Sequence, residues 1–331
     1  MTLAVEVSGL VKEYGGRGGV RALDGVDLQI PAGTVMCVLG PNGAGKTTTV
    51  RIISTLLKPT AGAVRVAGVD VLKNPMAARH RLGLSGQYAA VDENLTGYEN
   101  LRMVARLYGM TKSQASSRAR ELISSFQLEH AADRRSSTYS GGMRRRLDLA
   151  GALVARPKVV ILDEPTTGLD PRGRQDMWQV ISELVEDGTS VLLTTQYLEE
   201  ADFLADRITL IDKGRVIAQG SAEDLKSTIG GETMTIKMAP GQDMRTAHRV
   251  IAELGVGEPT GSPHNTELSV IVAEGTKTMV EVLRRLDDAH IYVVDANVAK
   301  PSLDDVFLSL TGQPAGTTET IETDRVEEAV L

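Results

Sequence analysis

The sequence predicts an α/β fold with a mixed sheet, followed by a smaller α+β domain. Three short apolar runs, Val35–Leu39, Val159–Leu162 and Ser190–Thr195, read as central strands because continuous apolar runs of this length are typical of strands buried on both faces. Helical patterns follow the first run at Thr47–Leu57 and the second at Arg174–Val185. This alternation of strand and helix is typical of an α/β domain.

The composition is that of an ordinary globular protein. Of 331 residues, 42% are hydrophobic and 24% are charged, and the mean hydropathy is −0.08. No apolar run approaches the roughly 20 residues of a membrane helix, and the first residues lack the pattern of a signal peptide. We therefore expect a cytoplasmic chain unless a partner carries it to a surface.

Charge and cysteine content exclude several other classes of protein. The net charge of −7 argues against a nucleic-acid-binding protein, which usually carries a basic face. The single cysteine, Cys37, excludes an internal disulfide and a cysteine metal cluster. Because Cys37 lies within an apolar run, we expect a buried core thiol and not a nucleophile.

Two strands precede the first apolar run. Residues 3–14 and 20–30 alternate well enough for half-buried antiparallel strands, and the glycine-rich stretch 15–19 forms the turn between them. The turn Pro31-Ala32-Gly33 then leads into the run at Val35.

The segment between the first apolar run and its helix has the pattern of a phosphate-binding loop. It matches G-x-x-x-x-G-K-[ST] in full, and the flanking strand and helix are the context that gives the pattern meaning. The residues that we expect to bind a nucleoside triphosphate here are Gly40, Pro41, Asn42, Gly43, Ala44, Gly45, Lys46, Thr47 and Thr48.

The chemistry of a triphosphate explains these residue types. Gly43 and Gly45 allow the backbone to curl so that several N–H groups point at one anion. The helix that begins near Lys46 adds its positive N-terminal end. Lys46 reaches the terminal phosphates, and the Thr47 hydroxyl suits Mg²⁺.

A helical insertion is predicted within the α/β domain, at about residues 88–150. Before it lie a β segment at Ala61–Val71, a short helix at Asn74–Leu82 and a short strand that ends before Gln87. The pattern from Glu99 to Gln127 is helical. Gln87 lies at the entrance of the insertion. Its amide could contact the metal or water at the phosphate, but a glutamine in this position is also compatible with an ordinary surface residue.

A second glycine-rich helix start lies at Ser140-Gly141-Gly142, and its helix runs to Val154. It fits a second phosphate-binding helix end. It fits equally a serine N-cap with a glycine turn, in which case the three arginines at 144–146 form a solvated face.

Two adjacent carboxylates end the second apolar run. Asp163 is placed at the carboxyl end of a central strand to hold Mg²⁺ through water, and Glu164 can take a proton from an attacking water. Their position downstream of a complete phosphate loop favours a functional pair. The stretch from Thr166 to Pro171, which contains Asp170, is a loop.

The α/β pattern continues and then stops. Trp178 is expected to pack within its helix, and strands at Ser190–Thr195 and Ile208–Ile211 lead to a hairpin across Lys213-Gly214. The pattern ends around Gly230-Gly231, which predicts a first domain over 3–228.

The rest predicts an α+β domain over 232–312 and a disordered acidic tail over 313–331. The strands expected in this domain are Thr233–Met238, Glu267–Val272 and Ile291–Val298, and the helices are Arg245–Leu254 and Thr276–Asp288. A last helix, capped by Ser302, carries Leu303, Val306, Phe307 and Leu310 on one face.

These motifs, in this order, resemble the ATP-binding cassette (ABC) ATPases over roughly residues 3–225. Gly40–Thr48 is similar to Walker A, Val159–Asp163 to Walker B, and Ser140–Arg144 to the signature motif, with Met143 where glutamine is usual. The resemblance implies roles for further residues: Gln87 as the Q-loop glutamine and a metal contact, Glu164 as the catalytic carboxylate, Asp170 in the D-loop, and Tyr14 as the aromatic that stacks on adenine. From position alone, Tyr14 fits a surface tyrosine as well.

Four longer stretches resemble the daunorubicin-resistance type of ATP-binding subunit more closely. They are LSGQYAAVDENLTGYENL, TYSGGMRRRLDLA, TTQYLEEAD and LDDVFLSLTG, the last of which lies in the C-terminal domain. This resemblance implies a separate membrane permease, a place at the cytoplasmic face of the membrane, and export of a hydrophobic drug or lipid. It also implies a head-to-tail homodimer that closes on ATP and Mg²⁺, with Ser140, Gly141 and Gly142 covering the nucleotide of the other copy.

One residue departs from the pattern of the family. Most cassettes have a histidine after the strand at Ser190–Thr195, and this chain has Gln196. A glutamine amide still donates a hydrogen bond but carries no charge. We predict that hydrolysis survives, with Gln196 orienting the attacking water.

Two other functions compete with transport. A cassette of the translation or DNA-repair type usually joins two cassettes in one chain or carries a basic face, whereas this chain is acidic with a single cassette. A non-hydrolysing regulatory cassette is disfavoured by Asp163 and Glu164.

Overall fold

The computed structural model describes residues 2–15, 19–87, 90–261 and 266–311, and it divides into two compact units. The first unit runs to Ala222 and the second begins at Glu223. The division comes before the Gly230-Gly231 pair, because helix α8 (Ala222–Ser227) precedes the glycines and belongs largely to the second unit. The expected tail at 313–331 lies outside the described residues.

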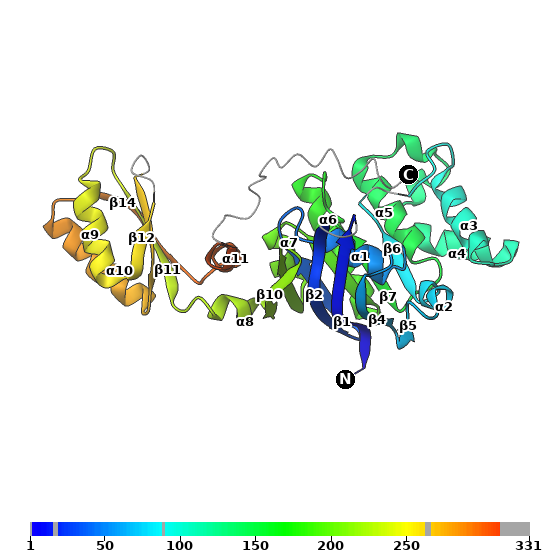
Figure 1. Ribbon diagram of the computed structural model, residues 1–331. Helices are drawn as coiled ribbons and strands as arrows, with labels where there is room; N and C mark the ends of the chain where they lie inside the picture. Colours follow the sequence, from blue (N-terminus) through cyan, green and yellow to red (C-terminus); the bar gives the residue numbers. More distant parts are fainter. Residues whose placement is uncertain (1, 16–18, 88–89, 262–265, 312–331) are drawn as a thin grey trace. The chain divides into compact units, whose positions relative to one another are not determined.

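A six-stranded sheet forms the centre of the first unit (Figure 1), in the order β10-β9-β3-β8-β7-β6. Strands β3, β7 and β8 are buried at every position, as their continuous apolar sequences predict. All neighbours are parallel except β9 and β10, which form the expected hairpin. The strands span Val35–Leu39 (β3), Leu82–Ser85 (β6), Val159–Asp163 (β7), Ser190–Thr195 (β8), Arg207–Asp212 (β9) and Arg215–Gly220 (β10).

A four-stranded antiparallel sheet, in the order β2-β1-β4-β5, packs against this centre. Its strands alternate buried and exposed residues, and their buried side chains share one hydrophobic core with helix α1 and the central sheet. The elements are β1 (Leu3–Tyr14), β2 (Val20–Pro31), β4 (Ala61–Val66), β5 (Val69–Asp70) and α1 (Lys46–Ile53). The mixed sheet and the antiparallel subdomain agree with the predicted fold class.

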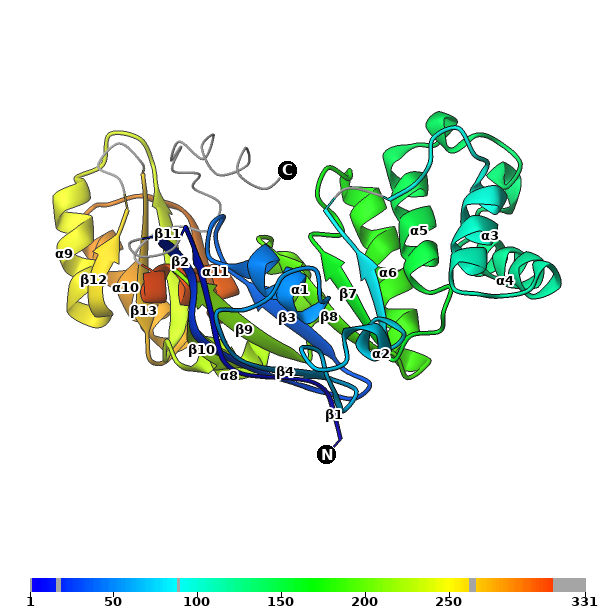
Figure 2. The ribbon, with the colours of Figure 1, turned by 45° about the vertical axis from the view of Figure 1, so that its right-hand side comes forward.

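Helices of the predicted insertion lie at the end of the first unit away from β10 (Figure 2). Helices α3 and α4 each begin with a capping box, in which a threonine and the residue three positions later satisfy each other's backbone N–H. The helices of this unit are α2 (Pro75–Arg79), α3 (Gly97–Leu107), α4 (Lys112–Ser125), η1 (Glu129–Ala131), η2 (Ser136–Thr138), α5 (Gly141–Ala152), α6 (Pro171–Glu186) and α7 (Leu198–Leu204). Within the described residues, no helix combines the length and apolar composition needed to cross a bilayer.

The second unit is an α+β domain built on an antiparallel sheet in the order β12-β13-β11-β14. Helices α9 and α10 pack on one face, where their apolar side chains meet those of β11 and β13 in a separate core. The elements are β11 (Glu232–Met238), α9 (Met244–Leu254), β12 (Val256–Thr260), β13 (Glu267–Val272), α10 (Gly275–Asp288), β14 (Val293–Ala299) and α11 (Leu303–Thr311). Ser302 caps α11, as expected, by accepting from the Asp305 N–H at 3.1 Å.

Candidate functional site: the loop between β3 and α1

The loop Gly40–Thr48 requires glycine at specific positions. Gly43 and Gly45 have φ angles of 79° and 108°, in the left-handed region. A Cβ on Gly40 would lie 2.2 Å from the carbonyl oxygen of Ile211, and one on Gly45 would lie 2.7 Å from Leu23 Cδ2. The loop is therefore pressed against its neighbours in a conformation that larger residues do not adopt.

The loop fits a polyphosphate. Helix α1 begins at Lys46 behind Gly45, which provides no side-chain cap, so the N–H groups of the first helical turn remain available as donors. Lys46 is buried, and its ammonium donates to the carbonyl oxygens of Gly40 at 2.7 Å and Pro41 at 3.1 Å. Burial lowers the pKa of Lys46, while the nearby carboxylates of Glu164 and Asp163 oppose that effect. The site thus combines backbone donors, a positive helix end and an ammonium group.

Oxygen atoms suited to Mg²⁺ lie beside this loop. Asp163 ends strand β7, and burial raises the pKa of its carboxyl, while hydrogen bonds from Thr194 and Thr47 oppose the rise. Mg²⁺ is usually held through one or two carboxylates together with substrate phosphates. Thr47 and Asp163 would supply a hydroxyl and a carboxylate, so the residues present fit the ion.

Glu164 stands where several polar groups converge. Its carboxylate lies 3.8 Å from the ammonium of Lys46, accepts from the Gln87 amide at 3.3 Å and accepts from the Thr167 hydroxyl at 3.3 Å. Its φ of 51° places a non-glycine residue in the left-handed region, which costs about 1–3 kcal/mol and occurs preferentially at functional sites. The structure therefore brings together Lys46, Gln87, Asp163 and Glu164.

Within the described residues, no hydrogen bond or ion pair joins four other expected site residues to this group. Ser140 is exposed and caps α5 by accepting from the Met143 N–H at 3.3 Å. Asp170 caps α6, Gln196 lies at the bend after β8, and Tyr14 ends β1 with the Lys12 ammonium 5.1 Å from its ring centroid.

Arg145 is a residue of this region that sequence reasoning missed. The alternative in which all three arginines form a solvated face is wrong for Arg145, which is only 7% exposed. Arg144 and Arg146 are partly exposed and pair with Glu93 and Asp176. Three identical neighbours on a helix give no sign of which one faces inward, because that is decided by the elements packed against the helix.

Sequence reasoning also missed a buried hydrogen bond between α6 and α7. Trp178 packs, as expected, stacked on Phe203 with 5.0 Å between ring centroids, but its indole also donates to Glu200 at 3.1 Å. Glu200 is fully buried, and burial raises its pKa. Cys37 in β3 is buried as predicted, and burial raises the pKa of its thiol well above the ordinary value.

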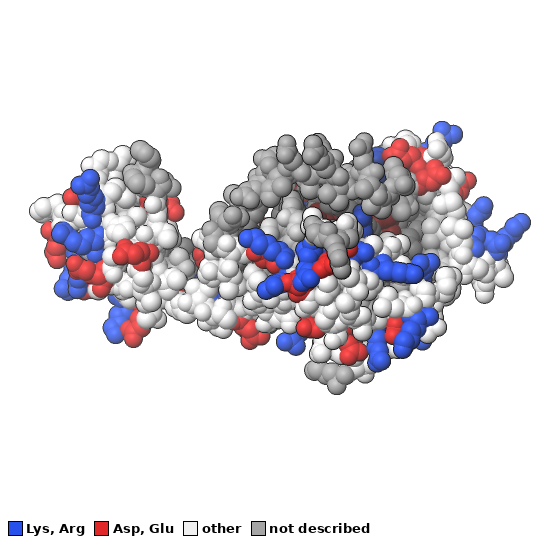
Figure 3. All heavy atoms as spheres, in the orientation of Figure 1, with Lys and Arg blue, Asp and Glu red and all other residues white. Residues whose placement is uncertain are grey.

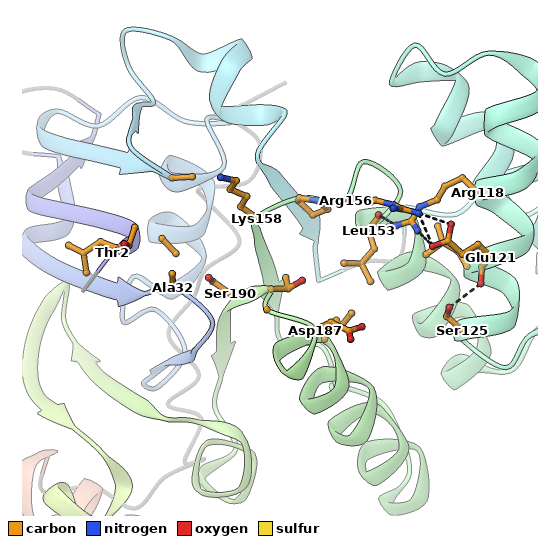
Figure 4. Close-up of a pocket in the computed structure, with 18 of the residues that line it drawn as sticks. Thr2, Ala32, Arg118, Glu121, Ser125, Leu153, Arg156, Lys158, Asp187 and Ser190 are labelled. Carbon is orange, nitrogen blue, oxygen red and sulfur yellow. Dashed lines mark hydrogen bonds and ion pairs between the residues drawn. The ribbon is translucent and has the colours of Figure 1, made fainter.

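A hollow of about 850 Å³ in the first unit does not hold these groups (Figure 4). Three of its charged residues, Arg118, Glu121 and Arg156, bind one another or backbone carbonyl groups. Arg118 donates to the Leu153 carbonyl oxygen at 2.6 Å and pairs with Glu121, and Glu121 also pairs with Arg156. None of the phosphate-loop or carboxylate residues lines it, so the candidate site remains the loop between β3 and α1.

Comparisons with known proteins agree with this geometry. The family model described as "ABC transporter" matches residues 23–167, and the one described as "ATP-binding protein DrrA1-3-like, C-terminal domain" matches residues 220–311. The chain is 50% identical over 322 residues to the daunorubicin/doxorubicin resistance ATP-binding protein DrrA of Streptomyces peucetius, covering 97% of this chain and 96% of that protein. It is 33% identical to the linearmycin resistance ATP-binding protein LnrL of Bacillus subtilis, covering 93% and 98% of the two chains.

Solved structures share the fold of the first unit. A dimeric post-hydrolysis structure of the ATP-binding cassette MJ0796, bound to ADP and Pi, aligns with a TM-score of 0.60 and 28% identity, covering 66% of this chain and 98% of that one. The cbiO1 protein of Clostridium perfringens, part of the ABC transporter complex cbiONQ, aligns with a TM-score of 0.63 and 27% identity, covering 68% and 91% of the two chains.

Proposed function

Because the chain belongs to the ABC transporter ATPases of the daunorubicin/doxorubicin resistance family, we propose that it drives export of a hydrophobic drug or lipid through a separate membrane permease. The observation that carries the proposal is the 50% identity that extends through both units, including the C-terminal domain. ATP hydrolysis drives transport in this family. The permease would hold this chain at the cytoplasmic face of the membrane.

The substrate class rests on the names of the relatives. Proteins 46–50% identical to this chain are named for resistance to daunorubicin or doxorubicin, one at 33% for resistance to linearmycin, and one at 36% for Nod factor export. These names favour export of a hydrophobic or amphipathic compound. They do not favour a role on ribosomes or DNA. Acidic and basic side chains are interspersed over the face drawn in Figure 3, whereas a nucleic-acid-binding protein usually carries a basic face.

The active unit is proposed to be a head-to-tail homodimer. Ser140, Gly141 and Gly142 begin α5 without joining the phosphate loop of their own chain, so a second copy would bring them to it. Each nucleotide would then lie between two helix N-termini, whose positive ends both favour a triphosphate. The dimeric MJ0796 structure supports this arrangement. The dimer would close on ATP, where the terminal phosphate adds charge, and open after hydrolysis.

Within each site we propose a role for each residue in nucleotide binding and hydrolysis. The loop N–H groups and Lys46 hold the phosphates, and Tyr14 stacks on the base. Thr47 and Asp163, with Gln87 nearby, would hold Mg²⁺, which would supply positive charge against the charge that develops on the phosphates. Glu164 accepts a proton from the attacking water, and Gln196 orients that water.

Replacing Glu164 tests this assignment. The E164Q variant keeps the shape of the side chain but loses its negative charge, so it can neither accept the proton nor form the ion pair with Lys46. It should bind Mg-ATP, hydrolyse it at least about a hundredfold more slowly, and elute as a dimer in gel filtration with saturating Mg-ATP. The matched control is E183Q, which changes an exposed carboxylate on α6 that accepts a hydrogen bond from Gln179. A monomeric E164Q protein under these conditions would count against the closed dimer.

The exporter proposal has a separate test. Purification from membranes in mild detergent should bring a hydrophobic permease with the chain, and cells that lack the protein should retain a hydrophobic compound. Copurification with ribosomes or DNA would instead support the translation or DNA-repair alternative. A wild-type protein without steady-state ATPase activity would support a regulatory cassette.

A further inference from the structure

The guanidinium of Arg145 donates hydrogen bonds to backbone carbonyl groups of two segments, residues 163–165 and the segment at Gly86. Its Nε donates to the Pro165 oxygen at 2.9 Å, and its Nη2 donates to the oxygens of Asp163 and Glu164, each at 3.1 Å. Its Nη1 donates to the Gly86 oxygen at 2.6 Å. Nη1 also lies 3.5 Å from the Gln87 oxygen. One buried side chain of α5 therefore binds three consecutive carbonyls around Glu164 and the two carbonyls of Gly86 and Gln87.

These carbonyls surround the strained residue of the site. Glu164 has its φ at 51°, and its N–H is held on the other side by Thr194, which accepts through its carbonyl at 3.0 Å and its hydroxyl at 3.2 Å. A left-handed non-glycine residue persists only when the surrounding structure fixes it. On the carbonyl side of this turn, the fixing group is Arg145.

We propose that Arg145 is a positioning residue for ATP hydrolysis, holding the Glu164 turn in its left-handed conformation and in register with the backbone before Gln87. The inference rests on the proposed role of Glu164. An arginine suits the task because its planar fork presents several N–H groups in fixed directions, whereas a lysine is a point charge.

The same helix carries Ser140 at its N-terminus and Asp148 one turn beyond Arg145. Asp148 is buried, accepts from the Ser85 hydroxyl at 2.6 Å and the Ala90 N–H at 2.7 Å, and lies 3.9 Å from Arg145 Nη1. Helix α5 is thus fixed to the end of β6 as well as to the Glu164 turn. A displacement of the Ser140 end would be passed to Glu164 and to the Gln87 segment of the same chain.

The test is the R145K variant of the full-length protein, assayed for ATP affinity and for turnover separately. Lysine keeps the charge and loses the fork, so nucleotide affinity, measured with a fluorescent ATP analogue, should stay within about twofold, while kcat should fall about ten- to a hundredfold because the carboxylate is displaced. The R145Q variant keeps a planar N–H₂ donor without the charge, and its kcat should fall in the same range.

Arg118 offers a matched control. It is also a partly buried arginine that donates to two carbonyls, those of Leu153 and Val154, but it lies on α4 beside the hollow in Figure 4. R118K loses the same planar set of guanidinium donors, but it loses them away from Glu164. Its kcat should therefore stay within about twofold of wild type.

Three results would overturn the proposal. They are a folded R145K protein with wild-type kcat, an R118K protein with an equal loss of kcat, or failure of both Arg145 variants to fold by circular dichroism, which would assign the residue to stability. If E164Q itself kept wild-type turnover, the role of Glu164 would fail instead, so the two failures are distinguishable.

Discussion

The hydroxyl of Thr194 donates to Oδ1 of Asp163 across the paired strands β8 and β7, with 2.5 Å between the two oxygen atoms. This contact orients the carboxylate that we propose holds Mg²⁺. Replacing Thr194 by valine keeps the shape and removes the hydroxyl, so the Mg²⁺ concentration for half-maximal ATPase activity should rise about tenfold, the usual effect of losing such a support. Thr209→Val, at a buried threonine on strand β9 of the same sheet, is the control. Unchanged Mg²⁺ titration of T194V would contradict the assignment.

Gln196 follows β8 directly, one residue after Thr195. If its amide orients the attacking water, Gln196→Ala should lower kcat about ten- to a hundredfold with little effect on ATP affinity, and Gln196→His should retain activity. Gln179→Ala, at an exposed glutamine on α6 whose amide donates to Glu183, should behave as wild type. A Q196A turnover rate equal to wild type would leave Gln196 without a catalytic part.

Glu200 should make stability depend on pH. Burial raises its pKa above the ordinary 4.5, although the nearby hydroxyls of Thr195 and Thr166 and the hydrogen bond from the Trp178 indole oppose the rise. The folded state therefore holds the proton more tightly than the unfolded state. The stability that protonation contributes is full below pH 4.5 and is lost as pH rises through the folded pKa.

The measurement is the melting temperature of Glu200→Gln and wild type at several pH values. Glutamine keeps the acceptor for the Trp178 indole and never ionises. The melting temperature of the variant should therefore rise relative to that of wild type as pH increases above about 4.5. Glu183→Gln, at an exposed carboxylate, should show no such trend. A difference between E200Q and wild type that is constant with pH would exclude the linkage.

The two units have separate cores, so calorimetry should resolve two unfolding transitions. Ligand that binds only the folded cassette stabilises it, by about 2.7 kcal/mol at one hundred times its Kd. Mg-ATP should therefore raise the midpoint temperature of one transition and leave that of the other unchanged. Leu286→Ala, at a fully buried residue of α10, should lower the free energy of unfolding of the second unit alone, by about 2–5 kcal/mol. Only the transition that Mg-ATP does not shift should then move to lower temperature. Equal shifts of both transitions with Mg-ATP would show that the units unfold together.

The central strands and the phosphate loop could be predicted because their signals are local. The run Val35–Leu39 and the glycine pattern after it carry their own context, and β8 was predicted with its observed bounds. Strand β12 was missed because its sequence, Val-Gly-Glu-Pro-Thr, combines glycine and proline, which have low strand propensity. Tertiary pairing with β13 overrides that preference.

Residues that act through long-range contacts could not be predicted. Arg145 lies 18 to 20 positions from the carbonyls of residues 163–165 and 59 from that of Gly86. The inward face of α5 depends on how β6 and β7 sit beside it, which no local pattern encodes. The same holds for the bond between Trp178 and Glu200, which joins α6 to α7.

Cys37 makes the protein convenient for spectroscopy. It is the only cysteine of the sequence, it is fully buried in β3, and its thiol resists ionisation. A maleimide dye should therefore leave the folded wild type unlabelled. A cysteine introduced at an exposed position would carry a single probe without first removing a native one, and slow labelling of Cys37 itself would report the opening of the central sheet.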